Sequence, residues 1–160
     1  MKQAVTIREA GPGQAATLLA LQREASVTGL AHIFPPERYP YPDEAVLQRW
    51  QTFEGRVLLA ELASRPVGIA AVEGCWLSGL YVLPDHWGAG VAAVLHDRAV
   101  EKIAHAAHPE ARLWVLVENR RARRFYERRG WVENGATRVV PYPPNPLDVG
   151  YSLALPPSVA

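Results

Sequence analysis

Apolar and polar residues recur along the chain at two spacings, one typical of strands and one typical of helices. The most apolar stretch, Val67 to Pro84, has the β-branched and aromatic content of sheet strands. It contains two predicted strands, Val67–Val72 and Trp76–Val82. A third, Val57–Leu62, precedes them across a hairpin signal at Ala63–Pro66. Weaker patterns predict strands at Val5–Arg8, Arg112–Val117, Trp131–Val140 and Leu147–Leu155.

Two helices are predicted in the first third of the chain. The first follows the breaker Gly11–Gly13, with Pro12 in its first turn. Its apolar side is formed by residues at helical spacing, namely Ala16, Leu18, Leu19, Leu21 and Ala25. Asp43 is expected to be the N-cap of a second helix that runs to about Trp50.

The second half of the chain contains two further helical patterns. A helix from about Gly88 to Ala106 is predicted by one apolar stripe: Val91, Val94, Leu95, Ala99 and Ile103. Asn119 is expected to cap a helix that continues through Arg129. Gly130 then stands where a left-handed residue commonly ends a helix.

Together these elements indicate one α/β domain over residues 1–160, with a mixed sheet and helices on its faces. Two proline-rich segments, Phe34–Pro42 and Pro141–Pro146, are expected to be loops because proline removes backbone donors and restricts the preceding residue.

Composition narrows the function classes. The chain is 49% hydrophobic and 21% charged with a formal net charge of +1, which fits a folded domain and gives no reason to expect nucleic acid or a membrane as partner. Cys75 is the only cysteine, so an intramolecular disulfide and a cysteine-rich metal site are excluded. No apolar leader follows Met1, and we therefore expect a cytoplasmic protein.

Metal binding is also not expected. Four histidines, His86, His96, His105 and His108, form no i, i+4 pair and have no carboxylate partner at metal spacing. Cys75 is interpreted as a small apolar residue of the interior rather than as an acyl-accepting nucleophile.

The segment Leu80–Ala92 carries the most chemical information. A strand there enters a short glycine-containing loop that opens a helix, and the free amides of a helix N-terminus favour a pyrophosphate. Val91-Ala92 after Gly90 do not supply the Lys-Ser/Thr pair of a P-loop. Ala93 stands at the third glycine of the dinucleotide fingerprint, which keeps a dinucleotide-dependent redox enzyme as an open alternative.

Two motifs together resemble the GNAT superfamily of N-acetyltransferases. The first is Val-x-Pro-x-x-x-Gly-x-Gly-x-Ala at Val82–Ala92, which resembles its acetyl-CoA signature. The second lies in Glu118–Trp131, where an asparagine, a small residue and Phe-Tyr precede a Gly-aromatic pair. The resemblance implies the GNAT fold, a mixed, mostly antiparallel twisted sheet of about seven strands flanked by about four helices. It also implies acetyl-CoA as cosubstrate.

By the same resemblance, a set of residues is expected to bind the cosubstrate: Leu80, Tyr81, Val82, Trp87, Gly88, Ala89, Gly90, Val91, Ala92, Asn119, Ala122 and Phe125. Asn119 is equally well explained as a plain helix cap. The family usually has Arg or Gln at the position of Trp87, so binding of the pyrophosphate is expected to rest on backbone amides.

The resemblance also implies catalytic roles. Tyr126 is expected to protonate the departing thiolate, and the alternative is that it is a core aromatic residue. No carboxylate lies in Trp76–Val82, where the family often has its base. Glu73 and His32 are the candidates for that base, and a water chain or an acceptor that arrives neutral are alternatives.

The sequence leaves alternatives for the roles of the basic helix and of the acceptor site. Six arginines between Arg120 and Arg129 form a dense basic surface, interpreted as a solvated face or as the place where Arg123 or Arg124 meets the 3′-phosphate of the cosubstrate. An aromatic acceptor pocket is expected from residues of the proline-rich loops and the central strand: Glu37, Tyr39, Tyr41, Trp76 and Tyr142.

The function expected from the sequence is N-acetylation of a small amine or a peptide amine by direct attack on the thioester. The alternative is a coenzyme A-binding regulatory or interaction module with little catalysis. The expected partner is the amine acceptor, and a homodimer is left open.

Overall fold

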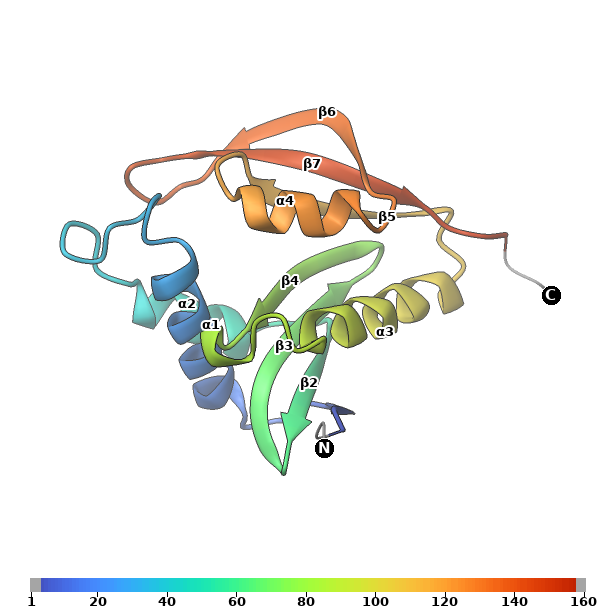
Figure 1. Cartoon of the computed structure of the whole chain (residues 1–160), viewed down its shortest axis with the longest axis horizontal. Coiled ribbons are helices and arrows are strands. Elements are labelled where there is room, and N and C mark those ends of the chain that lie inside the picture. The colour runs from blue at the N-terminus through green and yellow to red at the C-terminus, as the bar shows by residue number, and fades with distance from the viewer. Residues whose placement is uncertain (1–3, 158–160) are drawn as a thin grey trace.

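The computed structural model describes residues 4–157, which form one seven-stranded sheet, four α-helices and a short 3-10 helix (Figure 1). The strands are β1 (Thr6–Glu9), β2 (Arg56–Leu62), β3 (Arg65–Glu73), β4 (Trp76–Val82), β5 (Glu110–Leu116), β6 (Val132–Val139) and β7 (Leu147–Ala154). The helices are α1 (Ala15–Gly29), α2 (Asp43–Gln51), the 3-10 helix η1 (Pro84–His86), α3 (Val91–His105) and α4 (Arg120–Glu127). The predicted fold class is confirmed.

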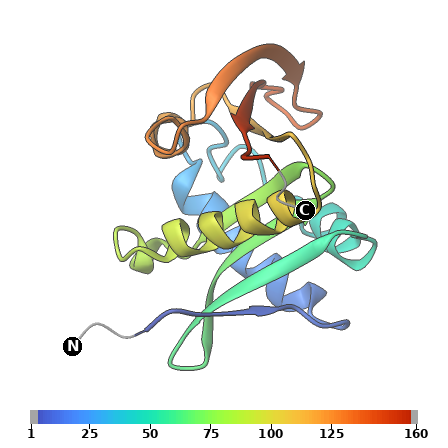
Figure 2. The same ribbon diagram turned by 90° about the vertical axis from the view of Figure 1, so that its right-hand side faces the viewer.

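The order of strands across the sheet is β1-β2-β3-β4-β5-β7-β6. Among the described strands, β4 and β5 form the one parallel pair, and their register contains a single pair of residues, Trp76 and Arg112. Beyond this point the two strands diverge, so β1–β4 and β5-β7-β6 form two halves that separate in space (Figures 1 and 2). The C-terminal end of β4 and helix α4 lie on opposite sides of the space between the two halves.

Helix α3 covers one face of the sheet and places the glycine turn at the end of β4. Four of the five residues predicted for its buried stripe, Val91, Leu95, Ala99 and Ile103, are at most 1% exposed, whereas Val94 is only half-buried. Close contact with β3 requires Gly68, where an added Cβ would lie 2.8 Å from Cδ1 of Leu95. Because Gly68 has no side chain, α3 can pack directly against the backbone of β3 at this position.

Helices α1 and α2 pack together in a second core cluster with β2 and β3 on the opposite face. Leu18 and Leu21 of α1 pack there with Trp50 of α2, and the indole of Trp50 donates to Oε1 of Gln22 at 2.8 Å. This buried hydrogen bond satisfies two polar groups in the core and fixes the two helices relative to each other.

Several predicted helix ends are wrong by a few residues. The first helix begins at Ala15, not at Pro12, since Gly13 has a left-handed φ of 88°. Asp43 is the first residue of α2 rather than its N-cap, and its carboxylate pairs with Arg23 at 3.0 Å. The helix after the glycine turn begins at Val91 rather than Gly88, because Gly88 and Gly90 both have positive φ. The last helix ends at Glu127, not Arg129.

Other local predictions are confirmed. The side chain of Asn119 accepts a hydrogen bond from the amide of Ala122 at 3.3 Å, as an N-cap does. Gly130 has a φ of 91°, the left-handed conformation expected after this helix. Phe34–Pro42 contains no regular helix or strand.

No helix within residues 4–157 combines the length and the apolar character that a bilayer crossing needs. The same residues contain no cluster of three or more histidine, cysteine, aspartate or glutamate side chains suited to a metal ion. Cys75 is half-buried and packs against the main core cluster.

Candidate active site

A groove of about 740 Å³ lies where β4 and β5 diverge. Its walls come from the C-terminal part of α1, the end of β4, the glycine turn that opens α3, and one side of α4. All the positions predicted to bind the cosubstrate line this groove except Ala89, and Tyr126 lines it as well. Residues far apart in the sequence thus meet along one surface.

The glycine turn forms the end of the groove nearest α3. Gly88 and Gly90 have φ values of 79° and 86°, and no heavy atom lies within 4 Å of the position that a Cβ would take on either. Gly90 is the N-cap of α3 and provides no side chain to satisfy the first helical amides. The turn therefore presents donor groups and open space, which suits an anionic group.

The end of β4 forms a second wall of backbone groups. In the described residues β4 pairs with β5 only at Trp76, so the side of Leu80–Val82 that faces β5 has no strand partner. One of these groups is already bonded, since the carbonyl oxygen of Val82 accepts the indole N–H of Trp87 at 2.8 Å. Unpaired groups on a diverging strand can bind an extended amide-containing chain as a further strand does.

Trp87 does not offer its indole N–H to a ligand, because that donor is bonded to Val82. One edge of the ring lies against α1, where a Cβ added to Gly29 would be 3.4 Å from Cζ2 of Trp87. The guanidinium of Arg121, from the first turn of α4, lies 3.5 Å from the ring centroid of Trp87. Such stacking of Arg on Trp is favourable.

Tyr126 is placed on the groove by the aromatic residues around it. Its side chain is 8% exposed and packs edge-to-face against Phe125 and Trp131, with ring centroids 5.4 and 5.9 Å away. Burial raises the pKa of the Tyr126 hydroxyl, and the neighbouring Tyr81 raises it further. The hydroxyl is therefore protonated at neutral pH and can donate a proton.

The two candidate bases lie outside this groove. Glu73 is exposed at the end of β3, beside the start of β4, while Tyr81 is at the other end of that strand. Tyr81 is five positions after Trp76 along the strand, a distance of roughly 17 Å. The structure does not bring Glu73 to the groove.

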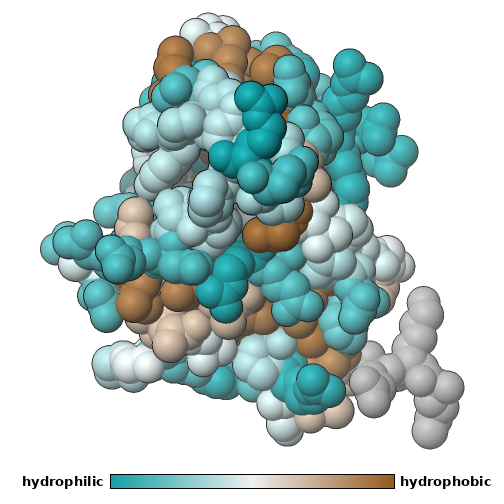
Figure 3. Space-filling view, turned by 90° about the vertical axis from the view of Figure 1, so that its left-hand side faces the viewer, coloured by the Kyte–Doolittle hydropathy of each residue, from teal (hydrophilic) through white to brown (hydrophobic). Residues whose placement is uncertain are grey.

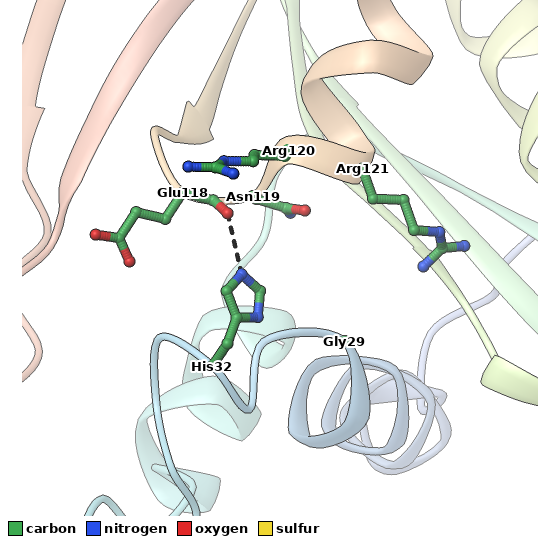
Figure 4. Close-up of a pocket in the computed structure, with 6 residues that line it drawn as sticks. All are labelled: Gly29, His32, Glu118, Asn119, Arg120 and Arg121. Atoms are coloured by element: carbon green, nitrogen blue, oxygen red, sulfur yellow. Dashed lines mark hydrogen bonds between the residues drawn. The ribbon is translucent and has the colours of Figure 1, made fainter.

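His32 lines a smaller pocket of about 300 Å³ that adjoins the N-terminus of α4 (Figure 4). Its Nε2 lies 3.0 Å from the carbonyl oxygen of Glu118. A carbonyl can only accept, so Nε2 carries the proton and donates it, which leaves Nδ1 free to accept one. Asn119 and Arg121 line both this pocket and the larger groove, so the two spaces are neighbours.

The arginines of α4 divide into two groups. Arg123 is turned away from the groove: it donates to the carbonyl oxygen of Val117 at 2.9 Å and to the hydroxyl of Tyr151 at 3.0 Å, and it pairs with Glu133. Of the two residues proposed for the 3′-phosphate, Arg123 does not line the groove. Arg124 lines the groove, together with Arg121, Arg128 and Arg129.

None of the residues expected in an acceptor pocket lines the groove or the adjoining pocket of His32. Trp76 stacks on Trp114 of β5 with ring centroids 6.1 Å apart. Tyr41 packs in the core cluster under α1 and α2, and Tyr142 is exposed in the loop between β6 and β7. Seen from the side of α1 and α2, the surface is largely hydrophilic, with separate apolar patches (Figure 3).

Two parts of the groove were missed by reasoning from sequence. Ser26, Gly29 and Leu30 at the end of α1 line it, although no motif indicates a ligand there. Arg121 was grouped with the basic surface of α4, because its stacking on Trp87 depends on the folded arrangement.

Comparison with known proteins gives a consistent result. The model of the acetyltransferase (GNAT) family matches residues 24–131. A curated relative from Archaeoglobus fulgidus, described as an uncharacterised N-acetyltransferase, is 36% identical over 81 residues, which cover 44% of this chain and 55% of that protein. The chain thus spans about half the length of this relative.

Solved structures show the same fold over nearly the whole chain. A GCN5-related N-acetyltransferase described as aminotransferase, class-II, from Rhodopseudomonas palustris is 23% identical, with a TM-score of 0.77 over 97% of this chain and 99% of that one. The PaiA N-acetyltransferase from Thermoplasma acidophilum, solved in complex with coenzyme A, is 18% identical, with a TM-score of 0.71 over 94% of this chain and 99% of that one. At these identities the likeness concerns the fold alone.

Proposed function

Because the chain belongs to the acetyltransferase (GNAT) family, we propose that it transfers an acetyl group from acetyl-CoA to an amine. The family predicted from the two motifs is confirmed by the match over residues 24–131. The observation that carries the proposal is the groove, which gathers the glycine turn, the free side of β4 and Tyr126 on one surface.

The residues of the groove fit coenzyme A. The open cradle at Gly88 and Gly90 suits its diphosphate, and the unpaired side of Leu80–Val82 suits the amides of its pantetheine arm. The PaiA relative, which shares the fold, was solved with coenzyme A. We place the diphosphate at the turn and the thioester near Tyr81 and Tyr126.

Acetyl-CoA supplies the activated acetyl group, and the protein positions it for attack by the amine. The amine nitrogen forms a bond to the carbonyl carbon, and the carbon–sulfur bond breaks. Tyr126 donates its proton to the departing thiolate sulfur, while a backbone amide of Leu80–Val82 donates to the carbonyl oxygen as negative charge develops on it. The excess proton of the amine leaves to a base or to water.

Few of the residues that line the groove could act as this base. Among the described residues that line it, none is an aspartate or glutamate. His32, with its free Nδ1 in the adjoining pocket, is better placed than the exposed Glu73. We propose that the acceptor arrives as the neutral amine, or that a water relay delivers its proton to His32.

We place the acceptor on the side of the sheet opposite α3. The stacked pair of Trp76 and Trp114 and the loop that contains Tyr142 are the aromatic groups we assign to it. An amine attached to an apolar body, or a peptide N-terminus, would suit aromatic surfaces of this kind. The cytoplasmic location, the single-domain organisation and a homodimer remain predictions from the sequence.

A second candidate function is a coenzyme A-binding module with little catalysis. It is favoured by one observation, the lack of a carboxylate among the described lining residues of the groove. The two functions share the cosubstrate site and differ only in turnover.

The test is thiol release from acetyl-CoA in the presence of a panel of small amines and short peptides with free N-termini. The proposal predicts release that depends on both the protein and an amine, with the acetylated amine detected by mass spectrometry. Tight binding of acetyl-CoA without release for any acceptor class would favour the binding module. Absence of acetyl-CoA binding would overturn both.

A further inference from the structure

Arg121 and Trp87 form a stacked pair at the entrance of the glycine turn. The guanidinium carbon of Arg121 lies 3.5 Å from the ring centroid of Trp87, the shortest cation–aromatic approach among the described residues. Arg121 is in the first turn of α4, whereas Trp87 directly precedes Gly88. The pair therefore joins the two sides of the groove at the turn.

Trp87 is held firmly enough to act as a platform. Its indole N–H is bonded to the carbonyl oxygen of Val82 at 2.8 Å, and its six-membered ring edge lies against Gly29 of α1. A larger residue in place of Gly29 would approach Cζ2 and Cη2 to within 3.5 Å. With one edge bonded and another packed, the ring can present only its face to Arg121.

Among the described residues, Arg121 has no competing partner. Within residues 4–157 its guanidinium makes no ion pair and no hydrogen bond, in contrast to Arg123, which has three partners. Stacking occupies only the face of a guanidinium and leaves its in-plane N–H donors available. Partial burial lowers the pKa of Arg121, as expected for a cation without an anionic partner.

We propose that Arg121, held on the ring of Trp87, binds the diphosphate of coenzyme A and supplies the positive charge that the glycine turn itself lacks. This inference rests on the proposed function and adds a residue to its binding site. The sequence of the turn contains no arginine or lysine from Pro84 to Ala93, so a permanently charged cation for the diphosphate comes from another element. Among the arginines that line the groove, Arg121 is the one that stacks on Trp87 at the turn.

The 3′-phosphate is assigned to other arginines. Arg124 and Arg128 line the groove about one and two helical turns beyond Arg121 along α4, farther from the glycine turn. Arg120, the neighbour of Arg121, points to the other side of the helix N-terminus (Figure 4) and does not line the groove. It is a matched control of equal charge.

Calorimetric titration of the whole protein with three ligands separates the possibilities. Coenzyme A carries both phosphate groups, dephospho-coenzyme A keeps only the diphosphate, and pantetheine has neither. The substitution Arg121→Gln is expected to weaken binding of the first two ligands by the same factor, about tenfold or more. It should leave pantetheine binding unchanged, and Arg120→Gln should match the unsubstituted protein throughout.

Two outcomes would overturn the assignment: equal affinities of Arg121→Gln and the unsubstituted protein, or a loss with coenzyme A that disappears with dephospho-coenzyme A. If the unsubstituted protein fails to bind coenzyme A, the proposed function fails instead.

The role of the platform is tested by a double-mutant cycle with Trp87→Leu, whose folding is checked by its thermal melting. If Trp87 holds Arg121, then Arg121→Gln should cost several-fold less affinity in the Trp87→Leu background than alone. Strictly additive losses would show that the ring does not position the cation. In the Trp87→Phe background, which keeps an aromatic ring, Arg121→Gln should still cause most of its loss of affinity.

Discussion

The indole N–H of Trp131 donates to Nε2 of His96, with 2.9 Å between the two nitrogens, and both side chains are buried. The other ring nitrogen of His96, Nδ1, lies 2.8 Å from the carboxylate of Asp97. These contacts require neutral His96 with its proton on Nδ1, since Nε2 must accept. Trp131 in turn packs against Tyr126, so this hydrogen bond ties the catalytic candidate to α3.

We expect His96 to make the protein less stable in mild acid. Burial lowers the pKa of His96 in the folded state, the nearby Arg129 lowers it further, and Asp97 partly offsets this by favouring the charged form. Below the unfolded value of about 6.5, the unfolded chain binds a proton that the folded chain excludes. Stability should therefore fall as the pH falls below that value, by at most about 1.4 kcal/mol per pH unit from this group.

Urea unfolding between pH 5 and pH 8 measures the effect, and His96→Gln is the comparison because glutamine does not titrate. The difference in unfolding free energy between the two proteins should shrink as the pH falls below about 6.5. A difference that stays constant with pH would contradict a buried neutral histidine.

Tyr126→Phe should lower the turnover rate roughly a hundredfold with little change in coenzyme A affinity. The hydroxyl makes no hydrogen bond to another described residue, so its removal takes away a proton donor and leaves the packing in place. Since burial raises the pKa of Tyr126, the unsubstituted enzyme should not lose activity through this group as pH rises toward the ordinary tyrosine range. Steady-state rates measured from pH 6 to pH 9.5 test both points, and equal rates for the two proteins would remove Tyr126 as the acid.

Gly90→Ala should reduce both stability and coenzyme A affinity. With φ at 86° an alanine is strained by about 1–2 kcal/mol even though space is open around its Cβ. Gly13→Ala is the matched control, because Gly13 has a φ of 88° with equally open surroundings and lies before α1. Unfolding free energies of the two variants should be similar, whereas only Gly90→Ala should weaken coenzyme A in a titration. Equal affinities would argue against the glycine turn as the anion site.

Arg123 and Arg124 should respond to substitution in opposite ways. Arg123→Ala removes the hydrogen bonds to Val117 and Tyr151 and should cost about 1–3 kcal/mol of unfolding free energy with coenzyme A affinity unchanged. Arg124→Ala, exposed on the groove, should change affinity and not stability. Chemical unfolding and titration of both variants give the comparison, and a reversed pattern would contradict the orientation of α4.

Local features were predictable because neighbouring residues determine them. The bounds of β4 coincide with the predicted strand, Asn119 caps α4 as expected, and Gly130 has the left-handed conformation expected for it. Periodicity and end signals depend on residues a few positions apart, which the sequence displays directly. The prediction of Asp43 as a cap failed: Asp43 is the first residue of α2, and its carboxylate pairs with Arg23, 20 residues away.

The shape of the site depends on contacts between distant residues, and these were not predictable from one sequence. The divergence of β4 from β5 after Trp76 creates the groove, yet no residue type signals it. The stacking of Arg121 on Trp87 joins residues of different elements. It places a guanidinium beside Trp87, a residue that by itself offers no charge to a phosphate. The orientation of Arg123 is likewise determined by Tyr151 and Glu133 on other strands.

The structure of the protein in complex with coenzyme A tests the central claim most directly. We predict the diphosphate within hydrogen-bond distance of the amides between Gly88 and Ala92, the pantetheine arm alongside Leu80–Val82, and the sulfur next to the hydroxyl of Tyr126. Coenzyme A bound elsewhere, or with its sulfur remote from Tyr126, would contradict the proposed active site.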